Sequence, residues 1–184
     1  LEPIVVPTPS HDGSHFDEGS LAIATSLLQG KDAMVVGPGL GQTPGTAAFV
    51  THLLGNDHPP AVVDADGLNV LAGGGADLLA GTVCTPHPGE LARLTGEPAA
   101  AIQADRAAHA SAFAQSRWTV VVLKGKETVI AAPEGDVYVC PLGNAGMATG
   151  GSGDVLAGLI GGLLAQGRAP KEAAILGVYV HALA

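Results

Sequence analysis

Residues 144–154 combine a run of glycines with a carboxylate in a way that suits phosphoryl transfer. The segment reads Asn-Ala-Gly-Met-Ala-Thr-Gly-Gly-Ser-Gly-Asp and leads directly into the apolar residues 155–166. Its glycines allow several backbone N–H groups to turn inward, and the start of a helix adds its positive end to that field. Asp154 stands at the rim, where a carboxylate can take the proton of a hydroxyl while the amides hold the moving group. The segment therefore predicts an anion-binding cradle with a general base beside it.

Asp154 also has a purely structural interpretation. Asp is a favourable residue at a helix N-terminus, where it stabilises the helix by about 1 kcal/mol. The residue type alone does not separate a helix cap from a catalytic base. The glycine run that precedes Asp154 favours the catalytic interpretation.

The elements that position this segment follow from the apolar pattern. Short apolar runs alternate with stretches of helical spacing, and Gly and Pro separate them. This alternation predicts an α/β fold, with a mostly parallel sheet covered by helices on both faces, in a single domain over residues 1–184. Strands are expected at 4–6, 33–36, 61–63, 82–85, 119–123, 127–132 and 136–140, and helices at 18–29, 43–54, 68–71, 76–80, 86–94, 98–116, 154–166 and 170–182.

Five loops with unusual residues follow the predicted strands. In open parallel sheets, ligands bind beyond the carboxyl ends of the strands, so these loops are expected to converge on one site. Glycine-rich turns can also be purely structural, and for 37–41 alone the two interpretations are equally good. The five loops are 37–41, 64–69, 85–90, 124–128 and 144–154.

The composition excludes several classes of partner. The net charge is −9 and Lys and Arg together number only eight, which argues against a nucleic-acid partner. No stretch reaches the roughly 18 apolar residues of a membrane span, so a cytoplasmic protein with no membrane partner is expected. Cys84 and Cys140 lie far apart in apolar runs, which favours buried free thiols in a reducing compartment over a disulfide.

Familiar nucleotide and catalytic motifs are missing from the sequence. There is no G-x-x-x-x-G-K-[ST], and residues 37–42, Gly-Pro-Gly-Leu-Gly-Gln, lack the final glycine of the dinucleotide-binding fingerprint. H-E-x-x-H, C-x-x-C and G-x-S-x-G are also absent. A nucleotide would therefore be held by another arrangement, of which residues 144–154 are the candidate.

Taken together, the five loops resemble those of the ADP/ATP-dependent NAD(P)H-hydrate dehydratases, metabolite-repair enzymes of the ribokinase-like superfamily. The resemblance covers nearly the whole chain, and the motif at 144–158 is highly specific. It implies a ribokinase-like three-layer architecture and a reaction that restores NADH and NADPH from their hydrated, inactive forms, NADHX and NADPHX. In that reaction the nucleotide phosphorylates the hydroxyl on the hydrated ring, and phosphate is then eliminated.

The resemblance also assigns roles by position. Gly41, His87 and Asp154 would contact the hydrated dinucleotide, with Asp154 as the base, and Glu90 would help to organise Mg²⁺ and its waters. Asp64 and Asp66 are equally compatible with helix caps and with outer-shell partners of Mg²⁺. The adenine nucleotide would be bound by Lys124, Gly125, Lys126, Glu127, Thr128, Asn144, Ala145, Gly146, Met147, Ala148, Thr149, Gly150, Gly151, Ser152 and Gly153.

Lys124 and His87 each have a structural interpretation as well. A lysine after five apolar residues can be a solvated charge at a strand end, and a histidine between two prolines is often a surface loop residue. The resemblance favours the functional interpretation of both.

Three further expectations come from the same resemblance. Residues 124–128, Lys-Gly-Lys-Glu-Thr, look more like the form that uses ADP than the form that uses ATP. A homo-oligomer is expected, with a tetramer as one form. The family's domain usually begins with strands upstream of Leu1 and continues beyond Ala184, so the chain is expected to be truncated at both ends.

Two other functions fit parts of the same pattern. A ribokinase-like kinase for a vitamin or a sugar would use the same cradle and Asp154 but would release a stable phosphorylated product. A nucleotide-binding module without turnover would be stabilised by the nucleotide and would catalyse no reaction. Residues 64–69 and 85–90 fit the dehydratase better than the kinase.

Overall fold

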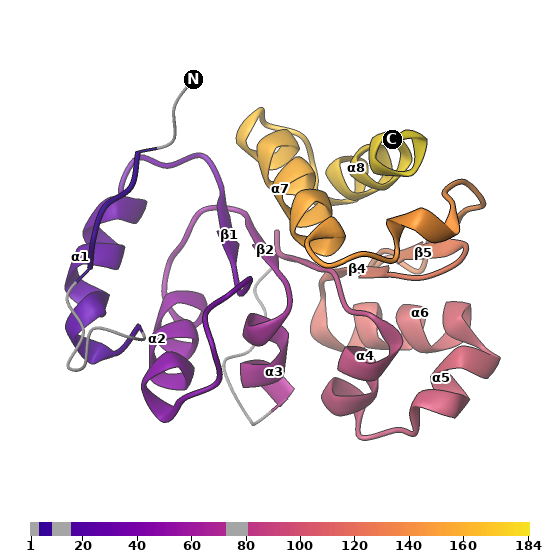
Figure 1. Cartoon of the computed structure of the whole chain (residues 1–184), viewed down its shortest axis with the longest axis horizontal. Helices are drawn as coiled ribbons and strands as arrows, with labels where there is room; N and C mark the ends of the chain where they lie inside the picture. Colours follow the sequence, from indigo (N-terminus) through magenta and orange to yellow (C-terminus); the bar gives the residue numbers. More distant parts are fainter. Residues whose placement is uncertain (1–3, 9–15, 73–80) are drawn as a thin grey trace.

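A single six-stranded sheet organises the computed structural model, which describes residues 4–8, 16–72 and 81–184. The strands lie side by side in chain order (Figure 1). The first four run parallel, and the last two continue the sheet as antiparallel strands. They are β1 (Met34–Val36), β2 (Ala61–Val63), β3 (Val83–Cys84), β4 (Val120–Leu123), β5 (Thr128–Ala131) and β6 (Val137–Cys140).

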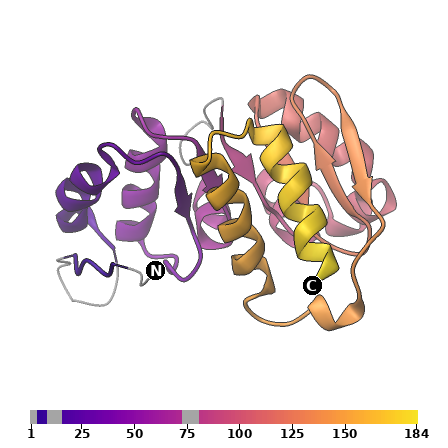
Figure 2. The ribbon, with the colours of Figure 1, turned by 90° about the horizontal axis from the view of Figure 1, so that it is seen from above.

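Helices cover both faces of this sheet. Those that connect the parallel strands lie on one face, and the last two helices lie side by side on the other (Figures 1 and 2). The first layer contains α2 (Pro44–Gly55), α3 (Asp66–Ala72), α4 (Pro88–Thr95), α5 (Ala99–Ala104) and α6 (Arg106–Arg117), with α1 (Glu18–Leu28) beside α2; the second contains α7 (Ser152–Ala165) and α8 (Pro170–Leu183). The predicted α/β class and its mostly parallel sheet are confirmed.

The sheet separates two apolar cores. Val63, Val121 and Leu123 face the first layer, while Val62 and Val122 face α7 and α8. Because each central strand is buried on both faces, its sequence is a continuous apolar run rather than an alternating one. The sheet therefore holds its carboxyl edge rigidly between two packed layers.

The helix predicted at 98–116 is two helices. The break falls at Asp105, whose φ of −144° is not helical, and whose side chain accepts a hydrogen bond of 3.0 Å from the backbone N–H of Ala108. Asp competes for backbone donors in this way, and it therefore favours helix starts over helix interiors.

The strand predicted at 4–6 is also wrong. Ile4 and Val5 are 92% and 83% exposed, and no described strand pairs with them. Without a neighbouring strand, β propensity does not produce a strand. The helix predicted at 76–80 lies outside the described residues.

The cysteines behave in part as expected. Both are free thiols, and Cys84 is fully buried in β3. Cys140 is only half-buried, because it ends β6, at the edge of the described sheet. Among the helices that the structure describes, none is both long and apolar enough to cross a membrane.

Candidate active site

The carboxyl ends of the parallel strands bring three of the predicted loops together. The backbone N–H of Asp64 donates to the carbonyl oxygen of Val36 at 3.1 Å, and that of Lys124 donates to Pro86 at 2.8 Å. These bonds continue the parallel pairing past the ends of the strands. Asp64, Pro86 and Lys124 therefore lie at neighbouring places along one edge of the sheet.

Lys124 joins two carboxylates at this edge. Its Nζ lies 2.6 Å from Oδ1 of Asp64 and 3.7 Å from Oε2 of Glu90. The carboxylate side chains are 1% and 7% exposed, whereas that of Lys124 is 21% exposed. A buried carboxylate needs a compensating charge, and Lys124 supplies it while part of its side chain still reaches solvent. The solvated interpretation of Lys124 is therefore wrong.

His87 and Glu90 form the start of α4. Nδ1 of His87 accepts hydrogen bonds from the backbone N–H groups of Gly89 and Glu90, at 3.0 and 3.2 Å. Oε2 of Glu90 accepts from the backbone N–H of His87 at 2.7 Å. This reciprocal cap fixes the His87 ring, and because Nδ1 is an acceptor, the neutral ring carries its proton on Nε2. The side chain is half exposed, and Nε2 lies 3.6 Å from Oε1 of Glu90.

Asp66 holds the glycine loop at 37–41. Its Oδ2 accepts from the backbone N–H of Gly41, and its Oδ1 accepts from Nε2 of Gln42, both at 2.8 Å. Gly37 packs so tightly against this region that a Cβ atom there would overlap the carbonyl oxygen of Asp64. Asp66 thus fixes the position of the loop rather than capping a helix end.

The first turn of α7 completes the site. Gly151 precedes the helix with φ of +87°, and Asp154 lies exposed in the first turn. A Cβ atom added to Gly153 would lie 3.5 Å from Nζ of Lys124 and 3.7 Å from Oδ2 of Asp64. Residues far apart in the sequence therefore meet here, and the positive N-terminal end of α7 lies close to the same edge.

The segment that leads into α7 is open to solvent. Asn144 begins a short 3₁₀ helix, η1 (Ala145–Met147), and its Oδ1 accepts from the backbone N–H of Gly146 at 2.8 Å. Most residues from 144 to 151 are exposed. A ligand can therefore reach the backbone of this segment.

The loop at 124–128 rests on a side chain from α6. Nη2 of Arg106 donates to the carbonyl oxygen of Leu123 at 2.8 Å, and the guanidinium packs against Gly125, whose φ is +148°. Burial lowers the pKa of Arg106, and the charge of Glu127 partly offsets this effect. The loop is closed by a bond of 3.1 Å from Oγ1 of Thr128 to the carbonyl oxygen of Gly125.

The structure offers carboxylates for a metal but not a complete protein cage. Among the described residues, no group of three or more His, Cys, Asp or Glu side chains could hold a metal ion. Mg²⁺ is usually bound through one or two carboxylates together with water and phosphates. Asp64 and Glu90 fit that arrangement for an ion that arrives with a nucleotide.

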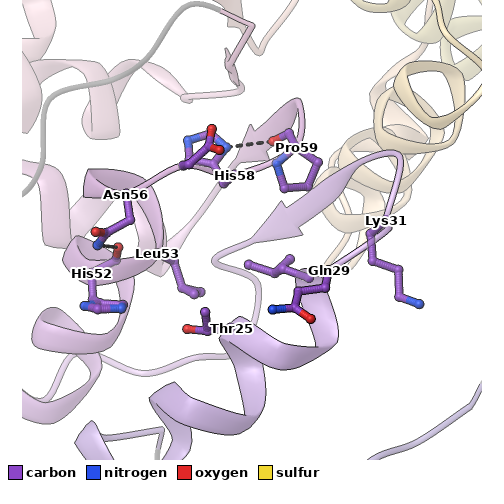
Figure 3. Close-up of a pocket in the computed structure, with 10 residues that line it drawn as sticks. Thr25, Gln29, Lys31, His52, Leu53, Asn56, His58 and Pro59 are labelled. Atoms are coloured by element: carbon purple, nitrogen blue, oxygen red, sulfur yellow. Dashed lines mark hydrogen bonds between the residues drawn. The ribbon is translucent and has the colours of Figure 1, made fainter.

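A separate pocket of about 440 Å³ lies between the ends of α1 and α2 (Figure 3). His52, His58 and Lys31 are among its lining residues. These residues precede β1 and β2, so the pocket lies near the amino ends of the strands. It is therefore not part of the site at the carboxyl edge.

Three contributions to the site have no signal in the local sequence. They are the hydrogen bond from Gly41 to Asp66, the hydrogen bond from Arg106 to the carbonyl oxygen of Leu123, and the contact of His181 with Ser152. Each depends on which elements become neighbours in space. Within the helix predicted at 98–116, Arg106 is one charged residue in an Ala-rich run, and nothing in the sequence indicates its contact with Leu123.

The order of the strands and the site at their carboxyl ends are found in proteins of one structural class. A ribokinase-like superfamily protein from Enterococcus faecalis superposes with a TM-score of 0.78 at 29% identity, covering 88% of this chain and 57% of that chain. The three-layer arrangement is therefore ribokinase-like, as predicted.

Comparison with protein families narrows the class. A family model described as NAD(P)H-hydrate dehydratase matches residues 2–184. The chain belongs to this family. The bifunctional NAD(P)H-hydrate repair enzyme Nnr of Moorella thermoacetica is 52% identical over 157 residues, which are 83% of this chain and 29% of that protein. The ADP-dependent (S)-NAD(P)H-hydrate dehydratase of Neisseria meningitidis is 44% identical over 178 residues, covering 92% and 60%.

A solved structure agrees with these relatives. The ADP/ATP-dependent NAD(P)H-hydrate dehydratase of Bacillus subtilis, co-crystallised with ATP and Mg²⁺, has 40% sequence identity and a TM-score of 0.72, covering 83% of this chain and 54% of that chain. The chain thus spans about a third of the length of the bifunctional relatives and less than two thirds of the length of the ADP-dependent dehydratases.

Proposed function

We propose that this chain carries the dehydratase activity that returns hydrated NADH and NADPH to their reduced forms, with ADP or ATP as the phosphoryl donor. The relatives with a single activity are named ADP-dependent, which supports ADP as the preferred donor. The observation that carries the proposal is the meeting of Gly153 with Lys124 and Asp64 at the carboxyl edge. It brings the N-terminal end of α7 close to the ammonium group of Lys124 and the carboxylate of Asp64, which supports an anion-binding site at this edge.

The reaction proceeds in two steps. Asp154 takes the proton of the hydroxyl on the hydrated ring as its oxygen attacks the terminal phosphorus of the nucleotide, and the bond from that phosphorus to the leaving nucleotide breaks. In the second step the C–O bond to phosphate breaks and a proton leaves the adjacent ring carbon. The ring regains its double bond, and inorganic phosphate and the shortened nucleotide are released.

The nucleotide is proposed to lie over residues 144–153, beside the loop at 124–128. The N–H groups at the start of α7 hold the transferred phosphoryl group, and Lys124 adds a positive charge close to them. When bound, Mg²⁺ neutralises phosphate charge, and Asp64 and Glu90 are the groups that would hold it through its water ligands.

The hydrated dinucleotide is proposed to lie on the other side of Asp154. Gly41, whose N–H already donates to Asp66, would contact it through other backbone atoms, and Nε2–H of the half-exposed His87 would serve as a donor. The reciprocal cap of α4 holds that donor in place, so its position does not depend on the substrate. Asp154 is then shared between the nucleotide and the hydrate.

We propose a cytoplasmic homo-oligomer, such as a tetramer, in which residues 1–184 form part of one dehydratase domain. The limited coverage of the relatives supports a domain that continues beyond this chain.

Product analysis tests this function against the kinase alternative, which the comparisons do not favour. The protein is incubated with hydrated NADPH, Mg²⁺ and either ADP or ATP, and the absorbance of the reduced nicotinamide and the phosphate are followed. Equal amounts of reduced cofactor and inorganic phosphate are expected. A stable phosphorylated product, or nucleotide binding without turnover, would contradict the proposal.

A further inference from the structure

His181, in the last turn of α8, contacts the first turn of α7. Its Nε2 lies 3.0 Å from the carbonyl oxygen of Ser152 and 3.2 Å from the Oγ of the same residue. The two helices run antiparallel across the sheet, so the end of one returns to the start of the other (Figure 2). Gly177 permits this close packing, because a Cβ atom there would lie 2.6 Å from Cγ1 of Ile160.

The atoms in this contact show which residue donates the hydrogen bond. A carbonyl oxygen can only accept, so Nε2 of His181 must carry the proton. That single N–H is shared between the carbonyl and hydroxyl oxygens of Ser152, and the hydroxyl oxygen therefore accepts as well. The hydroxyl proton of Ser152 is left free to donate elsewhere.

We infer that His181 is a positioning residue for the anion cradle. It holds the first turn of α7, which carries Gly153 and Asp154, and it turns the Ser152 hydroxyl into a donor for a phosphate oxygen. This inference rests on the proposed function, because it takes the ligand of the cradle to be the phosphate of a nucleotide. The cradle then contains the Ser152 hydroxyl as a hydrogen-bond donor besides its backbone amides, and His181 orients that hydroxyl.

His109 provides a matched control. Its Nδ1 lies 2.7 Å from Oε2 of Glu97, and its side chain is 23% exposed. It belongs to α6, on the opposite face of the sheet. Replacing either histidine by alanine removes one partly buried side-chain contact, but only His181 touches α7.

The test measures ADP affinity by calorimetry in His181→Ala, His181→Gln, Ser152→Ala and His109→Ala. His181→Ala is expected to weaken ADP binding about tenfold and to lower kcat up to about 10²-fold, since small displacements of a catalytic group have effects of that size. His181→Gln, whose amide can donate to the same oxygens, should recover most of the loss. His109→Ala should lower the melting temperature without changing ADP affinity.

The double variant His181→Ala with Ser152→Ala shows whether His181 acts by orienting Ser152 or only by stabilising the fold. If His181 acts through Ser152, then adding His181→Ala to Ser152→Ala should weaken ADP binding by much less than it does in the parent protein. ADP affinity that is unchanged in His181→Ala, or equally weakened in His109→Ala, would overturn the inference. If His181→Ala does not fold, unchanged affinity in Ser152→Ala would overturn it.

The same measurements keep the two proposals apart. ADP binding that depends on His181, without dehydration of the hydrate, would overturn the proposed function alone. If the protein dehydrates the hydrate and His181→Ala changes neither ADP affinity nor turnover, the positioning role alone is overturned. A parent protein that binds no ADP would overturn both.

Discussion

Lys124 and Asp64 form an ion pair of 2.6 Å between residues separated by 60 positions in the sequence. Asp64 is buried almost completely, and the first turn of α7 packs against both groups. The pair therefore joins the ends of β2 and β4 and lies against the helix that carries Asp154. A change that breaks this pair is therefore expected both to destabilise the folded protein and to disturb the site.

Removing the lysine should be costly for stability. Lys124→Met leaves the carboxylate of Asp64 buried without its partner, and we expect the free energy of unfolding to fall by about 3 kcal/mol. Lys171→Met breaks the exposed pair with Asp136, 2.9 Å long, and should have a much smaller effect on the free energy of unfolding because solvent screens that pair. Urea unfolding measures both. Equal losses in the two variants would contradict a structural role for the buried pair.

Gly37 should be far less tolerant of substitution than Gly39. Both have positive φ, at +129° and +71°, but only a Cβ atom at Gly37 would overlap a backbone atom, the carbonyl oxygen of Asp64. Gly37→Ala should lower the free energy of unfolding by about 3 kcal/mol, and Gly39→Ala by about 1 kcal/mol. Similar melting temperatures for the two variants would show that the loop at 37–41 does not pack as described.

The sequence predicted the fold through its apolar runs, and it predicted much of the site through strand-end loops. A continuous apolar run such as Val120–Leu123 is typical of a strand that is buried on both faces of a sheet, and a strand-end glycine such as Gly37 marks a close approach of two backbone segments. Contacts such as His181 with Ser152 could not be predicted, because they depend on how two helices return past each other. Asp105 shows the same limit locally, since an Ala-rich pattern concealed a cap that splits a helix.

Gly151 should matter for ADP binding through strain. Its φ is +87°, which a β-branched residue adopts only at a high cost, while the space around it is open. Gly151→Val should therefore distort the start of α7 and weaken ADP binding about tenfold. Gly162→Val, later in α7, also in open space but without a positive φ, is the control and should bind ADP nearly as the parent does. Unchanged affinity in Gly151→Val would argue against the cradle.

Cys84 should make stability fall at alkaline pH. Burial raises its pKa from 9.0 to about 12, and the hydrogen bond to Thr119 opposes this effect only in part. Above about pH 9 the unfolded chain loses the thiol proton while the folded protein keeps it, so the free energy of unfolding falls as pH rises toward about 12, by at most about 1.4 kcal/mol per pH unit. Urea unfolding of Cys84→Ala between about pH 8 and pH 11 should show a shallower decline. Cys140→Ala, which removes the half-buried thiol, is the control and should lose stability with pH as the parent protein does. If the free energy of unfolding of Cys84→Ala falls as steeply with pH as that of the parent, this account is contradicted.

Asp154→Asn tests the central claim most directly. The measurement is recovery of reduced-nicotinamide absorbance from hydrated NADPH with Mg²⁺ and ADP, together with ADP affinity. Asp136→Asn, on an exposed carboxylate paired with Lys171, serves as the control. If Asp154 is the base beside an intact cradle, its substitution lowers turnover by about 10²- to 10⁴-fold while ADP still binds, and the control keeps the parent rate. Turnover at the parent rate in Asp154→Asn would contradict the account.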